Sequence, residues 1–257
     1  MLCRNCGSTS VRDLGCIGGM APFFIKRVFQ IDIGLPPVAM QQCAACEFIQ
    51  TTIPFSADTL ARLYEDYRSD SYNRERIAYE PGYAAVADNI GGGYIESGMD
   101  RVTSLTRWLQ ARASVGDSML DYGGADGRFL PALPGAKYVY DISDVTPVEG
   151  VTRVTELESY GYVQLAHVLE HVSDPLGLTR RAAELVDAGG YLMVEVPQDL
   201  PDTLPGYLLL HEHINFYCAS AVRCLLEAVG LEVVDVGAVF IQSAYRNQFC
   251  IRGLARK

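Results

Sequence analysis

The chain has 257 residues, and 49% of them are hydrophobic, so it can bury a sizeable core. Its formal net charge of -10 argues against broad electrostatic binding to nucleic acid, because phosphate backbones attract basic surfaces. No apolar run is long enough to span a bilayer, and the N-terminal stretch MLCRNCGSTS lacks the apolar core of a signal peptide. We therefore expect a cytoplasmic protein without a membrane span.

Near the N-terminus, four cysteines form two CxxC pairs, Cys3 with Cys6 and Cys43 with Cys46. Two such turns can direct four thiolates towards one ion. Four sulfur ligands arranged as a tetrahedron are a coordination that zinc prefers. Four thiolates leave no open coordination position, so the predicted zinc is structural. The alternatives are four unligated thiols or a redox pair. The other cysteines are scattered, and we interpret them as ordinary small apolar residues: Cys16, Cys218, Cys224 and Cys250.

Two amphipathic helices are predicted after this module. The stretch SADTLARLYEDY has Ser56 as a candidate N-cap, and MDRVTSLTRWLQARA follows at 99–113. We therefore expect a zinc-binding module at 1–54 and a helical linker with a substrate lid at 55–115. Three tyrosines in the second region could line a site or simply pack: Tyr67, Tyr72 and Tyr83.

The remainder, 116–257, alternates predicted strands with predicted helices. We expect strands at 118–122, 136–143, 160–168, 191–197, 231–239 and 247–255, and helices at 174–190 and 220–230. This alternation predicts an α/β fold with a mostly parallel sheet, whose ligands bind beyond the carboxyl ends of the strands. The last two strands follow each other without a helix, which predicts an antiparallel hairpin at the sheet edge.

The loop LDYGGADGRFL after the first of these strands differs from a phosphate-binding loop, which needs GxGxxG and a following helix. Its polar and small residues are Asp121, Gly123, Gly124, Asp126 and Gly127. Carboxylates repel phosphate but suit a ligand with an ammonium group and hydroxyls. Asp141, followed by Ile142, ends the next strand, where ribose hydroxyls are commonly bound. The pattern favours S-adenosylmethionine over NAD, and the alternative is a solvated glycine turn.

From about Asp117 onward the chain resembles class I S-adenosylmethionine-dependent methyltransferases. The resemblance rests on LDYGGADG, YDIS, LAHVLEHVSDP and GGYLMVEVP. It implies a Rossmann-like class I methyltransferase sheet behind an N-terminal four-cysteine zinc module. It also implies a set of cofactor-binding residues: Asp121, Gly123, Gly124, Asp126, Gly127, Asp141, Ile142 and His167.

Within that group the chain is similar to the zinc-containing deoxysugar C-methyltransferases. The similarity rests on CAACEFIQT, on the DxGxxDG form of the glycine loop, and on an HEH segment at 211–213. Two positions depart from the family pattern, Glu47 where glycine is usual and Leu210 where tyrosine is common. The further C-terminal domain of the sugar enzymes has no counterpart in the sequence. The resemblance therefore supports the cofactor more than the sugar substrate or a carbon acceptor.

Methyl transfer requires alignment and often a base for the proton of the acceptor. The resemblance places HEHINFY over the methyl group, and histidine titrates near neutral pH. We expect His213 to be the base, with Glu212 orienting it or binding substrate. His211 is a catalytic or structural histidine, and His167 could touch substrate where the third predicted strand of the domain ends. His171 is expected to position its loop.

The sequence thus predicts methyl transfer to a small metabolite, such as a sugar nucleotide or a natural-product intermediate. The alternatives are an O- or N-methyltransferase of another small molecule, or a non-catalytic zinc protein that binds S-adenosylmethionine. A zinc ribbon that reads nucleic acid is disfavoured by the acidic charge and the absence of a basic run. The oligomeric state is not predicted.

Overall fold

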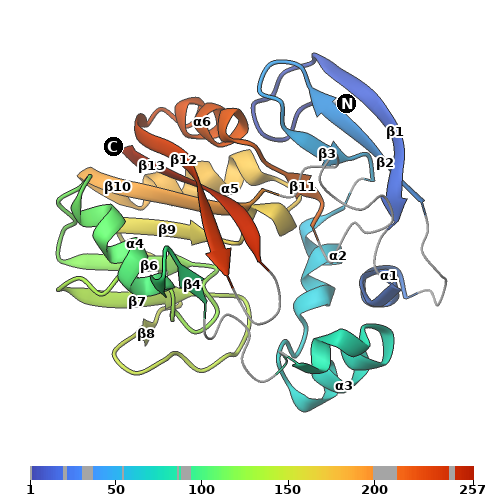
Figure 1. The fold of residues 1–257 in the computed structure, drawn as a ribbon, viewed down its shortest axis with the longest axis horizontal. Helices are drawn as coiled ribbons and strands as arrows, with labels where there is room; N and C mark the ends of the chain where they lie inside the picture. The colour runs from blue at the N-terminus through green and yellow to red at the C-terminus, as the bar shows by residue number, and fades with distance from the viewer. Residues whose placement is uncertain are drawn as a thin grey trace.

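The structure is a computed structural model that describes residues 2–19, 22–30, 37–53, 55–85, 87, 94–198, 213–242 and 247–257. Its strands form two sheets, and Figure 1 shows the smaller sheet beside one end of the larger one. The larger sheet has nine strands in the order β5-β4-β12-β13-β10-β9-β6-β7-β8. Their bounds are β4 Ile95–Glu96, β5 Met99–Asp100, β6 Ser118–Tyr122, β7 Ala136–Tyr140, β8 Thr152–Arg153, β9 Tyr160–Ala166, β10 Val186–Pro197, β12 Glu232–Gln242 and β13 Gln248–Arg256.

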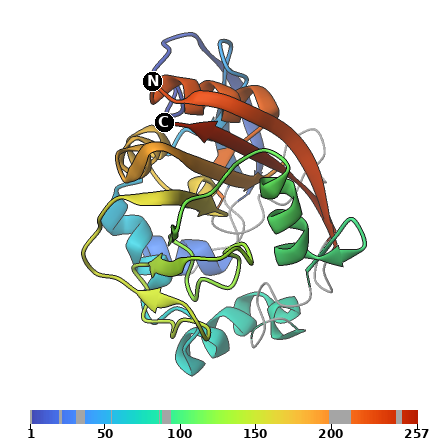
Figure 2. The ribbon, with the colours of Figure 1, turned by 90° about the vertical axis from the view of Figure 1, so that its left-hand side faces the viewer.

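The five strands from β8 to β10 are parallel, as expected, but the whole sheet is mixed, because the pairs from β10 to β5 are antiparallel. The final two strands, β12 and β13, pair antiparallel as expected. The hairpin lies towards one edge of the sheet, with β13 next to β10 and only the two-residue strands β4 and β5 beyond β12. The outer strand β12 is also covered at its end by β4, and Figure 2 shows these strand ends beside the β4–β5 hairpin.

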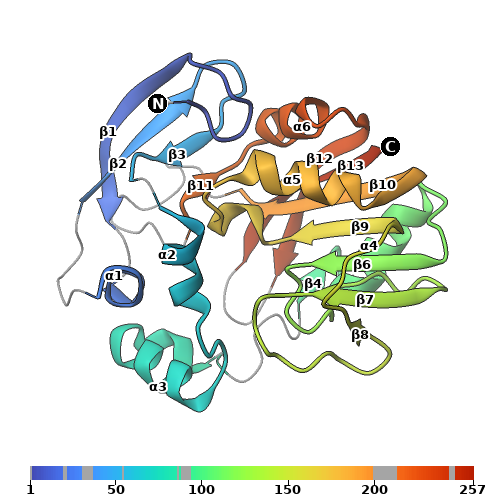
Figure 3. The same ribbon diagram turned by 180° about the vertical axis from the view of Figure 1, so that it is seen from behind.

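Helices cover both faces of the large sheet (Figures 1 and 3). The α4 helix, Arg101–Gln110, packs on one face through Leu105 and Leu109. On the other face lie α5, Pro175–Glu184, and α6, Ala219–Ala228. No helix of the described part of the chain is long and apolar enough to cross a membrane.

The helix predicted at 174–190 is shorter than expected. It ends at Glu184, and Val186 already pairs with Tyr160 as the start of β10. The two glycines of this segment bond to the C-terminal residue instead of capping a helix: Gly189 N–H donates to the Lys257 carbonyl, and Lys257 N–H donates to that of Gly190. Pairing with the sheet therefore overrides the helix-stop signal.

The smaller sheet has four antiparallel strands in the order β1-β2-β3-β11. They are β1 Val11–Gly19, β2 Pro37–Cys43, β3 Ile49–Thr51 and β11 Asn215–Phe216. The last of them comes from the C-terminal half of the chain, while β4 and β5 of the large sheet come from the stretch expected to be a linker. The three regions expected from the sequence thus exchange strands.

Short helices surround the smaller sheet: α1 Pro22–Phe29, α2 Ala57–Ala61, η1 Arg62–Tyr64, α3 Asp70–Tyr79 and η2 Pro81–Ala85. Ser56 caps α2 as predicted, accepting a bond from Thr59 N–H at 3.1 Å. The two tyrosines Tyr72 and Tyr83 are buried in the core around α1, so packing is their role. Tyr67 lies edge-on to Tyr72 with ring centroids 5.2 Å apart, which supports the same role for it.

A buried ionic cluster joins β13, β10, β4 and α4. Arg252, which is 0% exposed, contacts Glu96 at 2.6 Å and donates from Nε to Glu195 at 2.6 Å. Arg101 of α4 also pairs with Glu195, and Ser104 donates to Glu96 at 2.8 Å. Each member of this cluster is needed for the stability of the fold, because removal of one partner leaves a buried charge uncompensated.

We expect Arg252→Met to lower the free energy of unfolding by about 3–5 kcal/mol, since Glu96 then loses its guanidinium partner inside the fold. Chemical denaturation followed by circular dichroism measures the change. The control is Arg256→Met in the exposed end of the same strand, expected to change stability by less than about 0.5 kcal/mol. Equal stabilities of the two variants would contradict the role of the cluster.

Candidate functional site

The loop after β6 turns through several left-handed residues at the carboxyl edge of the parallel strands. Gly123 has a φ of +80° and its N–H donates to the Tyr140 carbonyl at 2.7 Å, which ties the loop to β7. A Cβ on Gly124 would lie 2.0 Å from Cγ of Asp121, so only glycine fits there. Ala125 has a φ of +53°, a conformation that glycine adopts more easily. The described residues 123–135 contain no helix, so no helix follows this loop directly.

Asp121 is fully buried in β6, beneath this loop. Among the described residues, neither of its carboxylate oxygens has a hydrogen-bond partner. Burial raises the pKa of Asp121 to about 7, while the neighbouring Gln164 and the charge of Arg101 act in the opposite direction. A buried carboxylate with open acceptor positions is suited to a cationic ligand group.

Arg101 supplies the opposite charge next to Asp121. Its side chain is 4% exposed, and its Nε and Nη1 find no acceptor in the part of the chain that the structure describes. The guanidinium lies 4.0 Å above the ring of Phe129. Burial lowers the pKa of Arg101 to about 10, so it remains a cation at neutral pH. Together the two side chains offer an acceptor and a donor to one zwitterionic group.

Asp141 and Ile142 follow directly after β7. Oδ2 of Asp141 accepts from Ala125 N–H at 2.8 Å, and Oδ1 accepts from the N–H and hydroxyl of Ser143 at 2.7 and 2.6 Å. The carboxylate is thereby fixed between two loops, and its remaining lone pairs can accept from hydroxyls. Ile142 is 70% exposed, an apolar side chain at the mouth of the site.

Asp126, the second carboxylate of the loop, is occupied by arginines. It contacts Nη1 of Arg68 at 3.3 Å and accepts from Nε of Arg128 at 2.8 Å. These arginine pairs, working against burial, lower the pKa of Asp126. The same loop also carries Gly127, with a φ of +74°. The structure therefore places Asp126 in an ion-pair network at the side of the loop, separate from the unpartnered Asp121.

His167 is the first residue after β9 and has a φ of +57°. Its Nδ1 lies 3.4 Å from Glu170 and its Nε2 lies 3.3 Å from Glu195. Cys250 Sγ lies 3.9 Å from the same Nε2. Burial lowers the pKa of His167, and the neighbouring Glu170 acts against that effect. His167 thus links the cofactor side of the site to the residues after β9.

His213 and His171 lie close together. Their ring centroids are 4.8 Å apart at an angle of 71°, and Glu170 completes a group whose ligand atoms lie within 4.8 Å of one another. His211 and Glu212 fall outside the described residues. Of the predicted HEH segment, the structure therefore places only His213, and it places it beside the loop after β9.

The four N-terminal cysteines converge. Sγ of Cys3 lies 3.7 Å from Sγ of Cys46, Sγ of Cys6 lies 3.7 Å from Sγ of Cys43, and all four sulfurs lie within 4.8 Å of one another. A hydrogen bond from the Cys3 thiol lowers the pKa of Cys46, which favours a thiolate in the cluster. This set of sulfurs fits a tetrahedral ion.

The two cysteine turns share one backbone hydrogen-bond pattern and one left-handed residue after the second cysteine. Gly7 N–H donates to the Cys3 carbonyl at 2.9 Å, and Glu47 N–H donates to the Cys43 carbonyl at 3.0 Å. Gly7 has a φ of +74° and Glu47 a φ of +61°. Glu47 therefore adopts a left-handed conformation that glycine takes up more easily.

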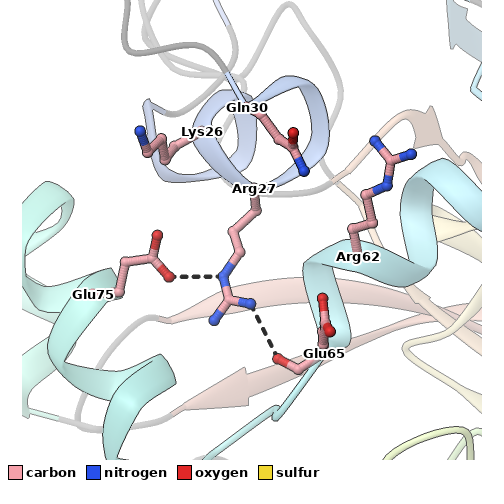
Figure 4. Close-up of a pocket in the computed structure, with 6 residues that line it drawn as sticks. All are labelled: Lys26, Arg27, Gln30, Arg62, Glu65 and Glu75. Carbon is pink, nitrogen blue, oxygen red and sulfur yellow. Dashed lines mark hydrogen bonds and ion pairs between the residues drawn. The ribbon is translucent and has the colours of Figure 1, made fainter.

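A separate hollow lies between α1, η1 and α3. Figure 4 shows Arg27 crossing it, with Nε 3.0 Å from Glu75 and Nη1 donating to the Glu65 carbonyl at 3.2 Å. Lys26, Gln30 and Arg62 complete the lining. The charge of Arg27 in this hollow is already paired with Glu75 and Asp66.

Three site residues were missed by sequence reasoning: Arg101, Gln164 and Glu170. A signal existed for Arg101, which shares an apolar helical stripe with Leu105 and Leu109 at intervals of four. A charge on an apolar stripe needs a partner or a ligand. Gln164 likewise interrupts the apolar run of β9, opposite Asp121 in the register. Glu170 carried no signal of this kind.

The methyltransferase domain family matches residues 96–236, which is more than half of the chain. The chain belongs to this family. It is an S-adenosylmethionine-dependent methyltransferase. The family match covers both the glycine loop and the loop after β9. No curated protein sequence matches the chain.

Two solved structures share the fold of this methyltransferase. The first is 1,6-didemethyltoxoflavin-N1-methyltransferase of Burkholderia thailandensis with bound 1,6-didemethyltoxoflavin and S-adenosylhomocysteine; the match covers 86% of this chain and 95% of that one, with 16% identity and a TM-score of 0.53. The second is magnesium protoporphyrin IX methyltransferase of Synechocystis PCC 6803 with bound S-adenosylhomocysteine; the match covers 78% and 100%, with 16% identity and a TM-score of 0.50. At 16% identity these two matches show a shared fold only.

We expect the affinity of the methyltransferase for S-adenosylmethionine to rise about tenfold per pH unit from pH ~5.5 until it levels off near pH ~7. Burial raises the pKa of Asp121 from 3.8 to about 7, so the ligand-free folded state holds a proton below that pH. A cationic ligand group favours the ionised form, hence binding strengthens as the proton leaves. Calorimetry across this pH range measures the slope.

Asp121→Asn should weaken binding and flatten the pH dependence. 5′-Methylthioadenosine is a matched control ligand, because it lacks the amino-acid end and should bind with little pH dependence. A flat affinity of the wild-type protein for S-adenosylmethionine would show that Asp121 does not face the cationic end.

Proposed function

We propose that this methyltransferase transfers a methyl group from S-adenosylmethionine to a small metabolite in the cytoplasm. The observation that carries the cofactor assignment is the buried pair of Asp121 and Arg101, whose acceptors and donors stay open among the described residues. In this proposal Asp121 receives the ammonium group and Arg101 the carboxylate of the methionine end. Asp141 accepts from the ribose hydroxyls.

The remaining cofactor contacts follow from the same placement. Ile142 lies under the adenine, and the backbone of Gly123, Gly124 and Gly127 comes close to the ligand because these residues have no side chain. Asp126 holds the loop through its arginine pairs. His167 borders the methionine end, between Glu170 and Glu195.

The cofactor supplies an electrophilic methyl group on a sulfonium, and the protein has to align the acceptor and take its proton. We propose His213 as the base, because it lies at the loop after β9 and is half-buried beside His171. Glu212 and His211 keep their proposed roles in orienting His213 or binding substrate. His167 is a further candidate for contact with the substrate.

For the acceptor we propose a sugar nucleotide or a natural-product intermediate, from the resemblance to deoxysugar C-methyltransferases. The two solved structures bear the names of methyltransferases that act on toxoflavin and porphyrin compounds, which supports a small acceptor. An O- or N-acceptor is the second candidate. A non-catalytic protein is less well supported, because the described His213 lies in a cluster suited to proton transfer.

We further propose that Cys3, Cys6, Cys43 and Cys46 hold one structural zinc. The argument is the mutual approach of the four sulfurs and the matching turns of both pairs. The proposed division of the chain is a zinc module at 1–54, a linker and substrate lid at 55–115, and a cofactor domain at 116–257. The exchanged strands bind these parts together.

Metal analysis of the purified protein should find about one zinc per chain, because the four thiolates form one closed site. Cys46→Ala should lose most of that metal. Cys16→Ala is the matched control, since Cys16 is exposed and outside the cluster. Full zinc content in Cys46→Ala would refute the assigned ligands.

His213→Gln should bind S-adenosylmethionine as the wild type does and turn over about 10²–10⁴-fold more slowly, because the proton of the acceptor has no receiver. Release of S-adenosylhomocysteine with a panel of sugar nucleotides and hydroxylated small molecules measures the rate. A turnover within a factor of two of wild type would remove His213 as the base.

A further inference from the structure

Glu170 lies at the centre of the acceptor side of the site. It belongs to η4, Leu169–His171, between β9 and α5, and it is 1% exposed. Among the described residues no hydrogen bond reaches either of its carboxylate oxygens. A buried carboxylate without such bonds is costly, so its charge must be balanced by the groups around it.

Those groups are histidines. Oε1 of Glu170 lies 3.4 Å from Nδ1 of His167 and 3.7 Å from Nε2 of His171. His171 in turn lies against His213, whose ligand atoms fall within 4.8 Å of those of Glu170 and His171. One carboxylate therefore lies among three imidazoles, two from the loop after β9 and one, His213, two residues before β11.

The backbone holds this arrangement. The carbonyl of Glu170 accepts from Ile214 N–H at 2.9 Å, directly after His213. The side chain of Asn215 donates to the carbonyls of Leu169 and Val172 at 2.8 and 2.7 Å. These bonds join the chain at His213 to η4 on both sides of Glu170, so the distance between them is set by the fold.

The charged and titratable groups that face the cluster come from η1, β10 and α4 and from the residue after β11. The Tyr64 ring of η1 lies 6.1 Å from that of His171, and buried Tyr217 donates to the Leu169 carbonyl at 3.3 Å. Glu195 of β10 reaches the cluster through His167 and is itself paired with Arg101 of α4. Burial acts to raise the pKa of Glu170, but the neighbouring charges of His171 and His167 outweigh it and lower that pKa. Glu170 is thus an anion within the cluster.

The geometry points to Glu170 as the positioning residue of the base: its buried carboxylate fixes the His171–His213 pair and stabilises the positive charge that arrives on it during methyl transfer. This inference rests on the proposed role of His213. The acceptor X–H gives its proton to His213, and the electron pair left on X forms the X–CH₃ bond. The electrons of the S–CH₃ bond return to sulfur, leaving neutral S-adenosylhomocysteine. The imidazolium then releases its proton to water.

The test uses the whole protein saturated with S-adenosylhomocysteine, so it requires no acceptor. The chain has four histidines, which gives four imidazole signals in an NMR titration of ¹³C-histidine-labelled protein. In Glu170→Gln we expect the pKa values of His213 and His171 each to fall by about one unit, because the stabilising anion is gone. In Glu170→Asp the negative charge is retained but lies farther from the histidines, because the side chain is one methylene shorter. We expect both pKa values to fall by about half a unit. This second variant carries the test if Glu170→Gln does not fold.

Glu184→Gln is the matched control, because Glu184 is exposed at the end of α5, and it should leave both pKa values unchanged. Unchanged titration of His213 in folded Glu170→Gln and Glu170→Asp overturns the inference. So does a second metal ion per chain that wild-type protein holds and Glu170→Gln loses, since the cluster would then be a metal site. Calorimetry with S-adenosylhomocysteine separates the two proposals. If the wild type does not bind it, the proposed function is wrong. If the wild type binds it but the pKa values of His213 and His171 are unchanged in the Glu170 variants, only the role of Glu170 is wrong.

Discussion

The structure depends on charges that are buried together. Glu96, Arg252, Glu195 and Arg101 occupy the α4 face of the large sheet, and His167 extends this group to Glu170 on the acceptor side. Opposite charges alternate from Glu96 through Arg252 and Glu195 to Arg101, so each of these four is compensated by its neighbours. The proposed cofactor and acceptor positions thereby share one electrostatic framework, anchored in strands and in the first turn of α4.

Features that follow from local patterns could be predicted from the sequence. Alternating apolar runs predicted the parallel strands, and the departure of LDYGGADG from a phosphate loop agrees with a loop that no helix follows. The sequence was insufficient for what depends on partners far along the chain. Pairing of Gly189 and Gly190 with Lys257 ended α5 early, and the short β4–β5 hairpin paired with the end of the outer strand β12. Asp121 and Asp126 looked equivalent as letters, yet Asp126 forms ion pairs with Arg68 and Arg128, whereas the Asp121 oxygens have no hydrogen-bond partner among the described residues.

The N-terminal module and the large sheet form one packed unit. Cys3, Cys43 and Cys46 belong to the same buried cluster as Leu225 and Ile251, and Phe48 packs 4.9 Å from Tyr217. Asn5 donates to the carbonyl of Ala221 in α6 at 2.9 Å. Local sequence patterns identify the cysteine pairs, but they contain no information on this docking, because the residues that receive the module lie more than 160 positions away.

The strand β11 connects the N-terminal module to the acceptor side of the site. It pairs with β3, close behind the second cysteine turn, and Thr51 N–H donates to the carbonyl of Ile214, the residue after His213. Loosening of the cysteine turns would therefore be transmitted along β3 to the acceptor side, while Asp121 and Asp141 are held by the parallel strands at the other end of the site. Removal of the proposed zinc would therefore act first on the proposed base at His213 and leave the cofactor residues in place.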